Sequence, residues 1–197
     1  MKKTANRLKW PIIGFFTLVL FIGYVSGLSA RQPDKDDGGA KAVVEVKFGR
    51  DCERLLIREL EGAKKDIFVA VYSITRKAIT SVLTDAVERG VKVRVKYDEE
   101  SSEWQGMKQA IGFLRKRGVD CTAIKMGDEY EKMHHKFAVV DGERVLTGSF
   151  NYTTTAATGN YEALLLIHSP EVAEVFLQEF EAIKSSGERE NDHSMIR

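Results

Sequence analysis

A histidine, a lysine and several hydrogen-bonding side chains are concentrated in one segment of twenty residues, 134–153. The segment otherwise has the apolar pattern and the central Asp-Gly pair of a β-hairpin. The polar side chains of interest are, in chain order, His134, His135, Lys136, Asp141, Ser149 and Asn151. A neutral imidazole can act as a nucleophile, an ammonium group supplies fixed positive charge, and hydroxyl and amide groups donate hydrogen bonds. Together these groups could supply a nucleophile and stabilise a developing negative charge.

The predicted hairpin also predicts how these side chains are arranged. Side chains alternate between the two faces of a strand, so His134 and Lys136 are expected to point the same way and His135 the opposite way. Alanine, valine and leucine fill much of the hairpin. The polar groups are therefore confined to a patch at its rim, which indicates a site. Zinc binding by His134 and His135 is not expected, because adjacent strand residues face opposite ways and no third ligand is obvious.

The spacing of these residues resembles the signature of the phospholipase D superfamily. His134-x-Lys136, followed after four residues by Asp141, matches the H-x-K-x4-D pattern of that family. The sequence GSFN at 148–151 matches the G-S-x-N that follows this pattern, and Glu162 lies where small bacterial members carry a glutamate. The three parts together are far more specific than H-x-K-x4-D alone.

The resemblance extends over residues 43–184. The segments AKKDIFVAVYSIT and ERGVKVRVKYD, at 63–75 and 88–98, also resemble the first strands of the family. The size and the single motif resemble the small bacterial secreted nucleases and the related mitochondrial cardiolipin hydrolases. The resemblance implies hydrolysis of a phosphodiester through a phosphohistidine intermediate, with no metal and no other cofactor.

Family resemblance also assigns a role to each residue of the motif. His134 is expected to be the nucleophile, and Lys136 is expected to hold positive charge beside the phosphate oxygens. Ser149 and Asn151 are expected to donate hydrogen bonds to the same oxygens. Glu162 is expected to accept a proton from the other ring nitrogen of His134 and so to fix its tautomer.

The aspartate of the motif, Asp141, is grouped with the catalytic residues but directly precedes the predicted turn. We therefore expect it to be partly structural and to hold the hairpin or the neighbouring backbone. We expect no metal at this site, because lysine, serine and asparagine supply the charge stabilisation that a metal would supply.

The chain contains one copy of the motif, and so one candidate histidine of this kind. The reaction also needs a general acid for the leaving oxygen and then a base for water. Larger members of the family supply these groups from a second copy of the motif. The resemblance therefore implies a homodimer in which two His134 side chains meet across a two-fold axis and form one composite site.

Charge bears on the choice between a nucleic-acid and a lipid substrate. Four of the 30 basic side chains lie in residues 1–30, which leaves 26 against 29 acidic side chains, a net charge of −3. A nucleic acid must then be held by a local basic patch. Lys92, Arg94 and Lys96 are predicted on one strand face, either as such a patch or as a solvated edge strand. Acidic residues in the loops 98–103 and 128–131 would repel DNA if they rim the site.

Two aromatic residues, Trp104 and Tyr130, are expected either to touch the substrate or to pack. Size and architecture favour an exported endonuclease acting on DNA or RNA. A phospholipase D or cardiolipin hydrolase is the alternative, and a non-catalytic phosphodiester-binding module is a third possibility. The intact set of motif residues argues against the third.

Alternating strand and helix patterns predict an α/β fold, with a mixed β-sheet flanked by helices, for a phospholipase D-like catalytic domain over residues 43–187. Predicted strands are 42–48, 66–74, 91–97, 119–125, the hairpin 135–148, and 161–168. Predicted helices are 52–65, 77–90, 104–118 and 169–187. Asp51 and Ser169 are expected to cap two of these helices. Residues 188–197 are predicted to be a polar tail.

The N-terminal segment, residues 1–30, has a basic start and an uncharged apolar run at 11–28. It is expected to be a cleaved signal peptide or a membrane anchor, followed by a polar linker at 31–42. Either alternative exports the domain across the cytoplasmic membrane, to a periplasmic, secreted or membrane-anchored location. Export would permit a disulfide between Cys52 and Cys121, although spacing alone does not decide it.

Overall fold

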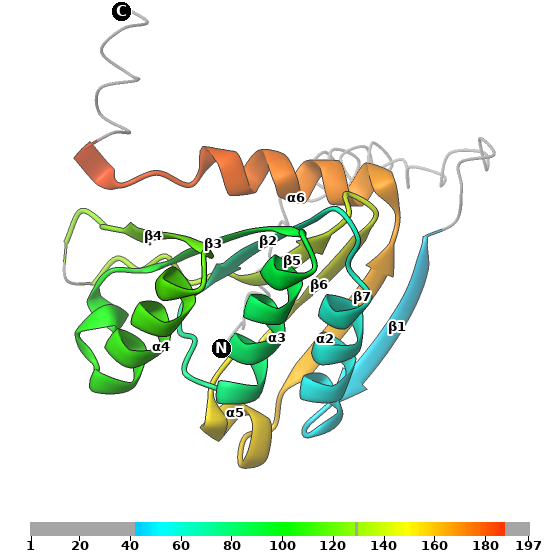
Figure 1. Cartoon of the computed structure of the whole chain (residues 1–197), viewed down its shortest axis with the longest axis horizontal. Helices are drawn as coiled ribbons and strands as arrows, with labels where there is room; N and C mark the ends of the chain where they lie inside the picture. The colour runs from blue at the N-terminus through cyan, green and yellow to red at the C-terminus, as the bar shows by residue number, and fades with distance from the viewer. Residues whose placement is uncertain (1–41, 129, 188–197) are drawn as a thin grey trace, which may run out of the picture. The chain divides into compact units, whose positions relative to one another are not determined.

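Seven strands form one mixed β-sheet in the part of the chain that the computed structural model describes, residues 42–128 and 130–187 (Figure 1). Their spatial order is β1-β7-β6-β5-β2-β3-β4. The strands are β1 (Val43–Phe48), β2 (Asp66–Val71), β3 (Lys92–Asp98), β4 (Asp120–Ile124), β5 (Lys136–Val140), β6 (Arg144–Gly148) and β7 (Ala163–His168). Strands β2, β3 and β4 are parallel neighbours, whereas all the other neighbours run antiparallel. The predicted α/β class with a mixed sheet is confirmed.

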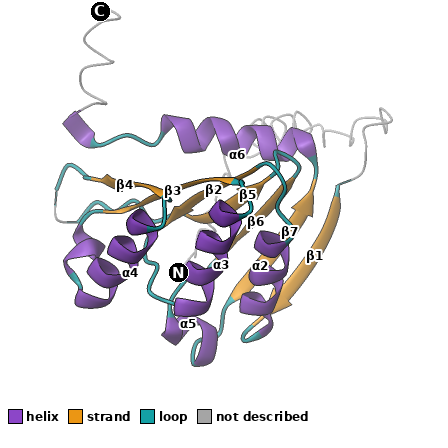
Figure 2. Cartoon of the chain, viewed as in Figure 1, coloured by secondary structure: helices purple, strands orange, loops and turns teal. Residues whose placement is uncertain are grey.

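Helices cover both faces of this sheet (Figure 2). Three lie against one face: α2 (Asp51–Glu61), α3 (Lys77–Glu88) and α4 (Gln105–Lys116). The last long helix, α6 (Pro170–Ala182), crosses the opposite face. The four predicted helices are thus present, each ending earlier than its pattern predicted.

Of the two predicted helix caps, Ser169 is confirmed and Asp51 is wrong. The Ser169 side chain accepts a hydrogen bond from the Val172 amide at 3.2 Å, and Pro170 follows it at the first helical position, as expected. Asp51 does not cap α2. The backbone of Arg50 already has helical angles, so Asp51 belongs to the first turn, where its negative charge favours the positive end of the helix dipole.

Two short helices were not predicted, a 3₁₀ turn η1 (Glu100–Glu103) and α5 (Thr154–Thr158). Neither is long enough to show a 3.6-residue hydrophobic period. The Thr153 side chain caps α5 by accepting a hydrogen bond from the Ala156 amide at 3.2 Å. Both short helices follow strand ends at the edge of the sheet that carries the site.

The hydrophobic core has two parts, one on each face of the sheet. Alternate residues of β5 serve both parts, since Ala138 belongs to the cluster under α2, α3 and α4, whereas Phe137 and Val139 belong to the cluster under α6. Phe180 of α6 is fully buried against the second cluster and meets the Phe68 ring edge-on at 5.3 Å. The strands that carry the site are thereby fixed from both sides.

The hairpin of β5 and β6 turns at the predicted Asp-Gly pair. Asp141 and Gly142 have φ values of 57° and 67°, and the Glu143 amide donates to the Val140 carbonyl at 3.1 Å. Positive φ at both central residues is the type I′ geometry that matches the twist of a hairpin. The turn therefore fixes the register of the two strands that carry Lys136 and Ser149.

Several expectations fall on residues that the structure does not describe. The signal peptide or anchor at 1–30, nearly all of the linker and the tail at 188–197 lie outside the described residues. Within residues 42–187, apart from 129, no helix has the length and apolar character needed to span a bilayer. Cys52 and Cys121 are both free thiols.

Candidate active site

The candidate site lies at one edge of the sheet, where five strand ends meet. Tyr72 follows β2, Asp98 ends β3, His134 precedes β5, Ser149 follows β6 and Glu162 precedes β7. Parallel strands bring their carboxyl ends to one edge, and antiparallel neighbours bring their amino ends there. Topology therefore gathers side chains that are up to ninety positions apart in the chain.

His134 lies two residues before β5 and exposes its side chain. Its ring centroid lies 5.0 Å from that of Tyr72. Partial desolvation by the surrounding chain lowers the pKa of His134, the positive charge of Lys136 lowers it further, and Asp98 opposes both effects. The site therefore favours the neutral imidazole, which is the nucleophilic form.

Asp98 holds the backbone that leads to His134. Its carboxylate accepts hydrogen bonds from the amides of Met133 and Ser101, both at 3.0 Å, and the residue is 1% exposed. The sequence reading placed Asp98 among acidic loop residues that would repel DNA. That reading is wrong for Asp98, because backbone donors surround its charge. Its position at the end of a buried strand was the available signal for a structural role.

Lys136 begins β5, and its side chain is buried. The Nζ atom donates to the carbonyl oxygen of His134 at 2.7 Å and lies 5.5 Å from the centroid of the Tyr72 ring. Burial lowers the pKa of Lys136, and the nearby carboxylate of Glu162 opposes this. The site thus holds a desolvated ammonium group whose attraction for a phosphate is little screened.

The prediction that His134 and Lys136 lie on one strand is wrong. Strand β5 begins at Lys136, so His134 and His135 are not strand residues. The two candidate catalytic side chains nevertheless both lie beside the ring of Tyr72. His135 has a different partner, the Glu179 carboxylate of α6, at 2.9 Å. Sequence analysis did not identify Tyr72 as a site residue.

Ser149 and Glu162 form the other half of the site. The Ser149 hydroxyl donates to the Glu162 carboxylate, and the Ala163 amide donates to the Ser149 oxygen at 3.1 Å. Asn160, which sequence analysis also missed, donates to the second carboxylate oxygen of Glu162 at 3.0 Å. Glu162 was expected to partner His134, whereas its hydrogen bonds within the described chain go to Ser149 and Asn160.

The glycine of the GSFN segment is required by a close backbone approach. A Cβ atom on Gly148 would lie 2.2 Å from the carbonyl oxygen of Ala163. Any other residue would push β6 away from β7 at this point. Gly148 thus allows the hydroxyl of Ser149 to reach Glu162.

Asn151 lies beyond Ser149 and is half-buried. Its Oδ1 atom is buried and has no hydrogen-bond partner among the described residues. Leaving such an atom unpaired costs free energy, which a bound hydrogen-bond donor would recover. The side chain therefore retains hydrogen-bonding capacity that the described part of the chain does not use.

Asp141 is the one motif residue that the structure does not bring to the site. It lies at the far end of β5, about 16 Å along the strand from Lys136. Its carboxylate accepts hydrogen bonds from the amides of Lys64 and Lys65 at 2.9 and 2.7 Å, and from the Arg144 guanidinium at 2.7 Å. It therefore ties the hairpin to the segment before β2, which is the structural part of its expected role and not a catalytic one.

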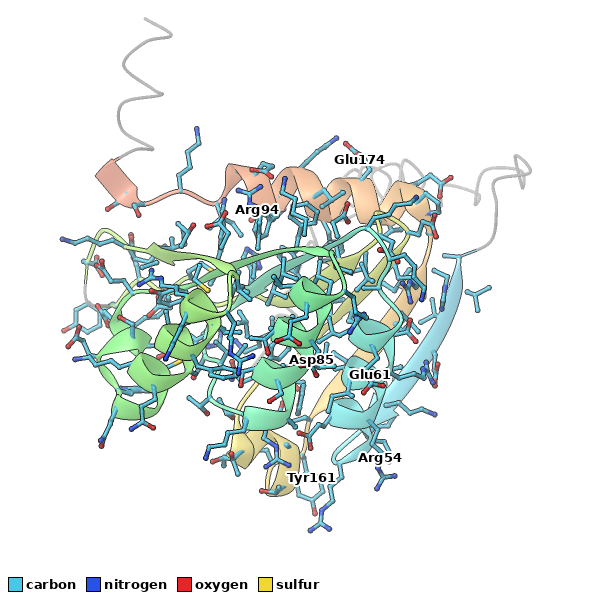
Figure 3. All side chains as sticks on the ribbon, in the orientation of Figure 1. Arg54, Glu61, Asp85, Arg94, Tyr161 and Glu174 are labelled. Carbon is cyan, nitrogen blue, oxygen red and sulfur yellow. The ribbon has the colours of Figure 1, made fainter. Side chains whose placement is uncertain are left out.

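The predicted basic patch on β3 is also corrected. Arg94 pairs with Glu181 of α6 at 2.5 Å, and Figure 3 shows it pointing toward that helix. Lys96 is buried and donates to the carbonyl oxygens of Phe180 and Ile183 at 2.6 and 2.8 Å. Lys92 is exposed at the start of β3. At Arg94 and Lys96, however, this face is neither a polyanion surface nor a solvated edge, because β3 lies between β2 and β4 and α6 ends on it. Burial under α6 is not visible in the local sequence.

A metal site was not expected. The described residues contain no group of three or more histidine, cysteine, aspartate or glutamate side chains arranged to hold a metal ion. Lys136 supplies the cationic charge at this edge of the sheet.

Residues 56–184 match the family described as cardiolipin synthase, PLD-like domain. The match covers well over half of the chain, and with the fold and the motif it shows that the chain belongs to this phospholipase D-like family.

Particular relatives support this assignment. The chain is 34% identical over 138 residues to mitochondrial cardiolipin hydrolase of Homo sapiens, which covers 70% of this chain and 53% of that protein. It is 30% identical over 135 residues to phospholipase D of Rickettsia typhi, which covers 68% of this chain and 64% of that protein. The chain thus spans about half to two thirds of the length of these curated relatives.

Among solved structures, the domain superposes on Nuc from Salmonella typhimurium, a phospholipase D family member. The TM-score is 0.68 at 28% sequence identity, and the match covers 73% of this chain and 94% of that one. The seven-stranded sheet and its helical layers therefore correspond to almost the whole of Nuc.

Proposed function

We propose that this protein hydrolyses phosphodiester bonds through a covalent phosphohistidine. One observation carries the proposal: His134 and Lys136 both lie beside the ring of Tyr72, where the environment favours a neutral imidazole and holds a buried ammonium group. In the first step a ring nitrogen of His134 attacks phosphorus, the N–P bond forms, and the bond to the leaving oxygen breaks while that oxygen takes a proton. In the second step water attacks phosphorus, the N–P bond breaks, and the water proton passes to a base.

Lys136 and Ser149 supply the phosphate contacts in this proposal. The Lys136 ammonium donates to a carbonyl oxygen in the free protein, and a phosphate oxygen offers it a stronger, charged acceptor. Ser149 is held at Glu162 and lies at the same sheet edge. Asn151 adds a side-chain amide, whose Nδ2 group is the donor to the phosphate oxygens. Preorganised groups of this kind stabilise the transition state more than the ground state.

The general acid is proposed to come from a second copy of this chain. The chain carries one motif, and Glu162 is engaged by Ser149 and Asn160, so the donor proposed for the leaving oxygen is a second His134 in its protonated form. A two-fold axis beside the site would place both histidines at one phosphate. Glu162 of each copy could then accept a hydrogen bond from the His134 ring of the other copy.

An exposed apolar strip supports such a dimer. Val44, Val46 and Phe48 on the edge strand β1 are 50%, 44% and 68% exposed, and we call them the edge strip. They share the face of the sheet that α6 covers, since the intervening Glu45 reaches Arg58 of α2 on the other face. Phe48 pairs in register with Ala163, the residue after Glu162. The edge strip therefore ends beside the candidate site, where a partner chain would complete it.

We favour nucleic acid as the substrate, in keeping with the resemblance to small secreted nucleases and with the match to 94% of the small protein Nuc. Phospholipid is the second candidate, because the curated relatives are named cardiolipin hydrolase and phospholipase D. We further propose that residues 1–30 direct the domain across the cytoplasmic membrane, in line with their basic start and apolar run.

One assay separates these candidates from a non-catalytic binding module. The full chain is offered single- and double-stranded DNA, RNA, cardiolipin vesicles and bis(p-nitrophenyl) phosphate, all in EDTA. We expect cleavage of the nucleic acids and the small diester, loss of all activity in His134→Ala, and smaller loss in the adjacent control His135→Ala. Cleavage of cardiolipin alone would establish the second candidate. No turnover of any substrate would establish the binding module.

A further inference from the structure

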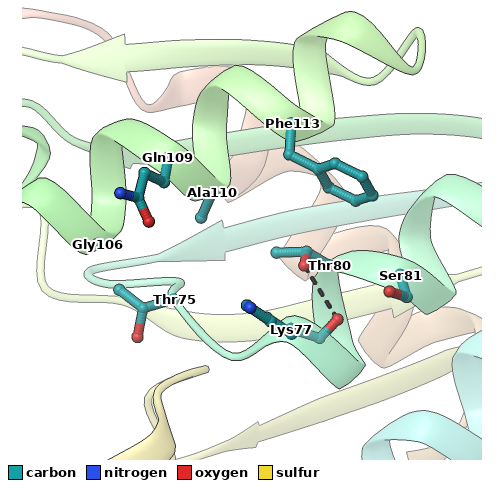
Figure 4. A pocket seen from close by; sticks show the side chains of 8 residues that line it. All are labelled: Thr75, Lys77, Thr80, Ser81, Gly106, Gln109, Ala110 and Phe113. Atoms are coloured by element: carbon teal, nitrogen blue, oxygen red, sulfur yellow. Dashed lines mark hydrogen bonds between the residues drawn. The ribbon is translucent and has the colours of Figure 1, made fainter.

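A cavity lies in the helical layer, between α3 and α4, with a volume of about 400 Å³ (Figure 4). No catalytic residue of the preceding scheme lines it. Its lining residues are Thr75, Lys77, Thr80, Ser81, Gly106, Gln109, Ala110 and Phe113.

The lining divides into a polar end and an aromatic end. At the polar end Lys77 extends toward Thr75, and Gln109 lies close by (Figure 4). At the other end the ring of Phe113 lies over Thr80 and Ser81. These groups suit a nucleotide. The cation and the hydroxyl and amide donors can bind its phosphate, and the aromatic ring can stack on its base.

The Phe113 ring is held in place from outside the cavity. The Arg117 guanidinium lies 5.5 Å from its centroid and also pairs with Glu88 of α3 at 2.8 Å. The arginine thus links α4 to α3 and supports the ring at the same time. An aromatic ring that is already ordered loses little entropy when a base stacks on it.

Aromatic residues connect this cavity to the nucleophile. The Tyr72 ring lies 5.0 Å from His134 and 6.1 Å from Trp104, which is 54% exposed. Trp104 is the residue before α4 and stands two positions before Gly106 of the cavity. Thr75 follows Tyr72 by three residues, a span of at most about 10 Å. A strand of a few nucleotides held at His134 can therefore reach the cavity past Trp104.

The cavity and a neighbouring cleft differ in charge. The loops after β3 and β4 enclose a cleft whose lining includes Lys125 and the carboxylates of Glu99, Asp128 and Glu131. Among the lining residues of the cavity between α3 and α4, the charged one is Lys77. The cavity is therefore the more favourable of the two for a polyanion.

We propose that the cavity between α3 and α4 is an accessory subsite for an unpaired nucleotide near the scissile phosphate. The base packs on Phe113, and the phosphate lies at Lys77. This rests on the proposed phosphodiesterase function and narrows it to substrates with at least a local single-stranded stretch, because a paired base cannot leave its stack to enter the cavity without cost.

The test measures binding in a chain that cannot react. Full-length His134→Ala protein is titrated with a fluorescent single-stranded DNA of about ten nucleotides, and anisotropy gives Kd as a function of salt. Adding Lys77→Ala or Phe113→Ala is expected to raise Kd about tenfold, in line with one base stack or one phosphate contact. Lys77→Ala should also reduce the salt slope by about one. The matched control is Lys108→Ala, an exposed lysine of α4 that pairs with Glu103 outside the cavity.

A second variant acts by filling the cavity. Ser81 is exposed on α3, so Ser81→Trp places bulk beside Phe113 without disturbing the core and should weaken binding as much as Phe113→Ala does. Equal Kd values for the cavity variants and the Lys108→Ala control would overturn the subsite. Weakened binding of cardiolipin vesicles with unchanged DNA binding would also overturn it, in favour of a lipid site. Failure of the proposed function is distinguishable, since it would appear as absent turnover in the unmodified chain while DNA binding remains.

Discussion

The Lys136 Nζ atom donates a hydrogen bond to the carbonyl oxygen of His134 at 2.7 Å, so the charged group of the site is positioned by the backbone of its nucleophile. The same ammonium group lies 5.5 Å from the centroid of the Tyr72 ring, which also contacts His134. Three residues from two strand ends therefore fix one another. A substitution at Lys136 is expected to change the charge, the ring contact and the loop together.

Lys136→Ala is expected to lower kcat by a factor of about 10² to 10³, the effect of removing one strong donor to a developing negative charge. Lys136→Arg should not restore the rate, because a planar guanidinium does not fit the buried place of an ammonium group beside Tyr72. The measurement is steady-state hydrolysis of bis(p-nitrophenyl) phosphate. A wild-type rate in Lys136→Arg would show that the placement of the charge is unimportant.

The pH dependence should show a nucleophile that stays neutral in weak acid. Burial and the charge of Lys136 lower the pKa of His134, so its protonation, and the loss of the nucleophile, occurs below the ordinary histidine value of about 6.5. The acid limb of kcat/KM should therefore lie below that value. Asp98→Asn removes the charge that opposes these effects and should move the limb lower still. An acid limb above pH 7 would contradict this account of the environment.

Asp141 should matter for stability and not for the chemical step. Asp141→Asn is expected to lower the free energy of unfolding by about 2 kcal/mol at pH 7, because backbone amides and Arg144 lose a charged acceptor. These donors hold the pKa of Asp141 below its ordinary value. The stabilisation is thus complete above the unfolded-state pKa of about 3.9 and is lost as pH falls through the lower folded-state value.

Urea denaturation at pH 7 and near pH 3 measures this difference. The wild type and Asp141→Asn should converge in stability at the lower pH. The control is Glu143→Gln, a charge change at an exposed residue of the same turn, which should leave stability within about 0.5 kcal/mol. A large loss of kcat in folded Asp141→Asn would return the residue to the catalytic group.

Much of the fold was accessible from sequence because its signals are local. The Asp141-Gly142 turn, the Ser169 cap and the apolar strands each depend on residues that are neighbours in the chain. The errors concern contacts between distant elements. The face of Lys96 seemed available to a polyanion, but α6 ends on it some ninety residues later.

The candidate site shows the same division. The motif marked His134, Lys136, Ser149 and Glu162, and the structure gathers them at one sheet edge. The motif could not show that the partner of Glu162 within one chain is Ser149, because this contact depends on how closely β6 approaches β7. Residues that only hold the backbone of the site in place, such as Asp98, belong to no motif and cannot be found from its spacing.

Gly148→Ala should disrupt the site through the backbone. The added methyl group would meet the Ala163 carbonyl oxygen, so β6 and β7 must separate, at a cost of about 3 kcal/mol, and the Ser149 hydroxyl leaves Glu162. Activity and thermal stability should fall together. Gly142→Ala is the control, because its φ is 67° but nothing lies within 4 Å of the added Cβ. It should cost only about 1 kcal/mol and leave activity intact. Equal losses of stability and activity in the two variants would show that the close approach of Gly148 to the Ala163 carbonyl is not the reason for the glycine.

The last prediction concerns the composite site. If each reaction uses two His134 side chains, one from each copy, a heterodimer of wild-type and His134→Ala chains lacks either the nucleophile or the acid. Activity at constant total protein should then fall with the square of the wild-type fraction, measured after the chains are mixed, unfolded and refolded together.

A charged residue in the edge strip provides an independent test of whether turnover requires the dimer. Phe48 is 68% exposed and lies beside the site, so Phe48→Glu should prevent association and abolish turnover while the chain stays folded. Val175→Glu, at an exposed residue of α6 outside the edge strip, is the matched control for adding an acidic charge to an apolar surface position. Sedimentation measures the dimer, and hydrolysis of the small diester measures the site. A linear fall on mixing, together with a fully active Phe48→Glu monomer, would mean that each chain carries a complete site and that a residue other than the second His134 protonates the leaving oxygen.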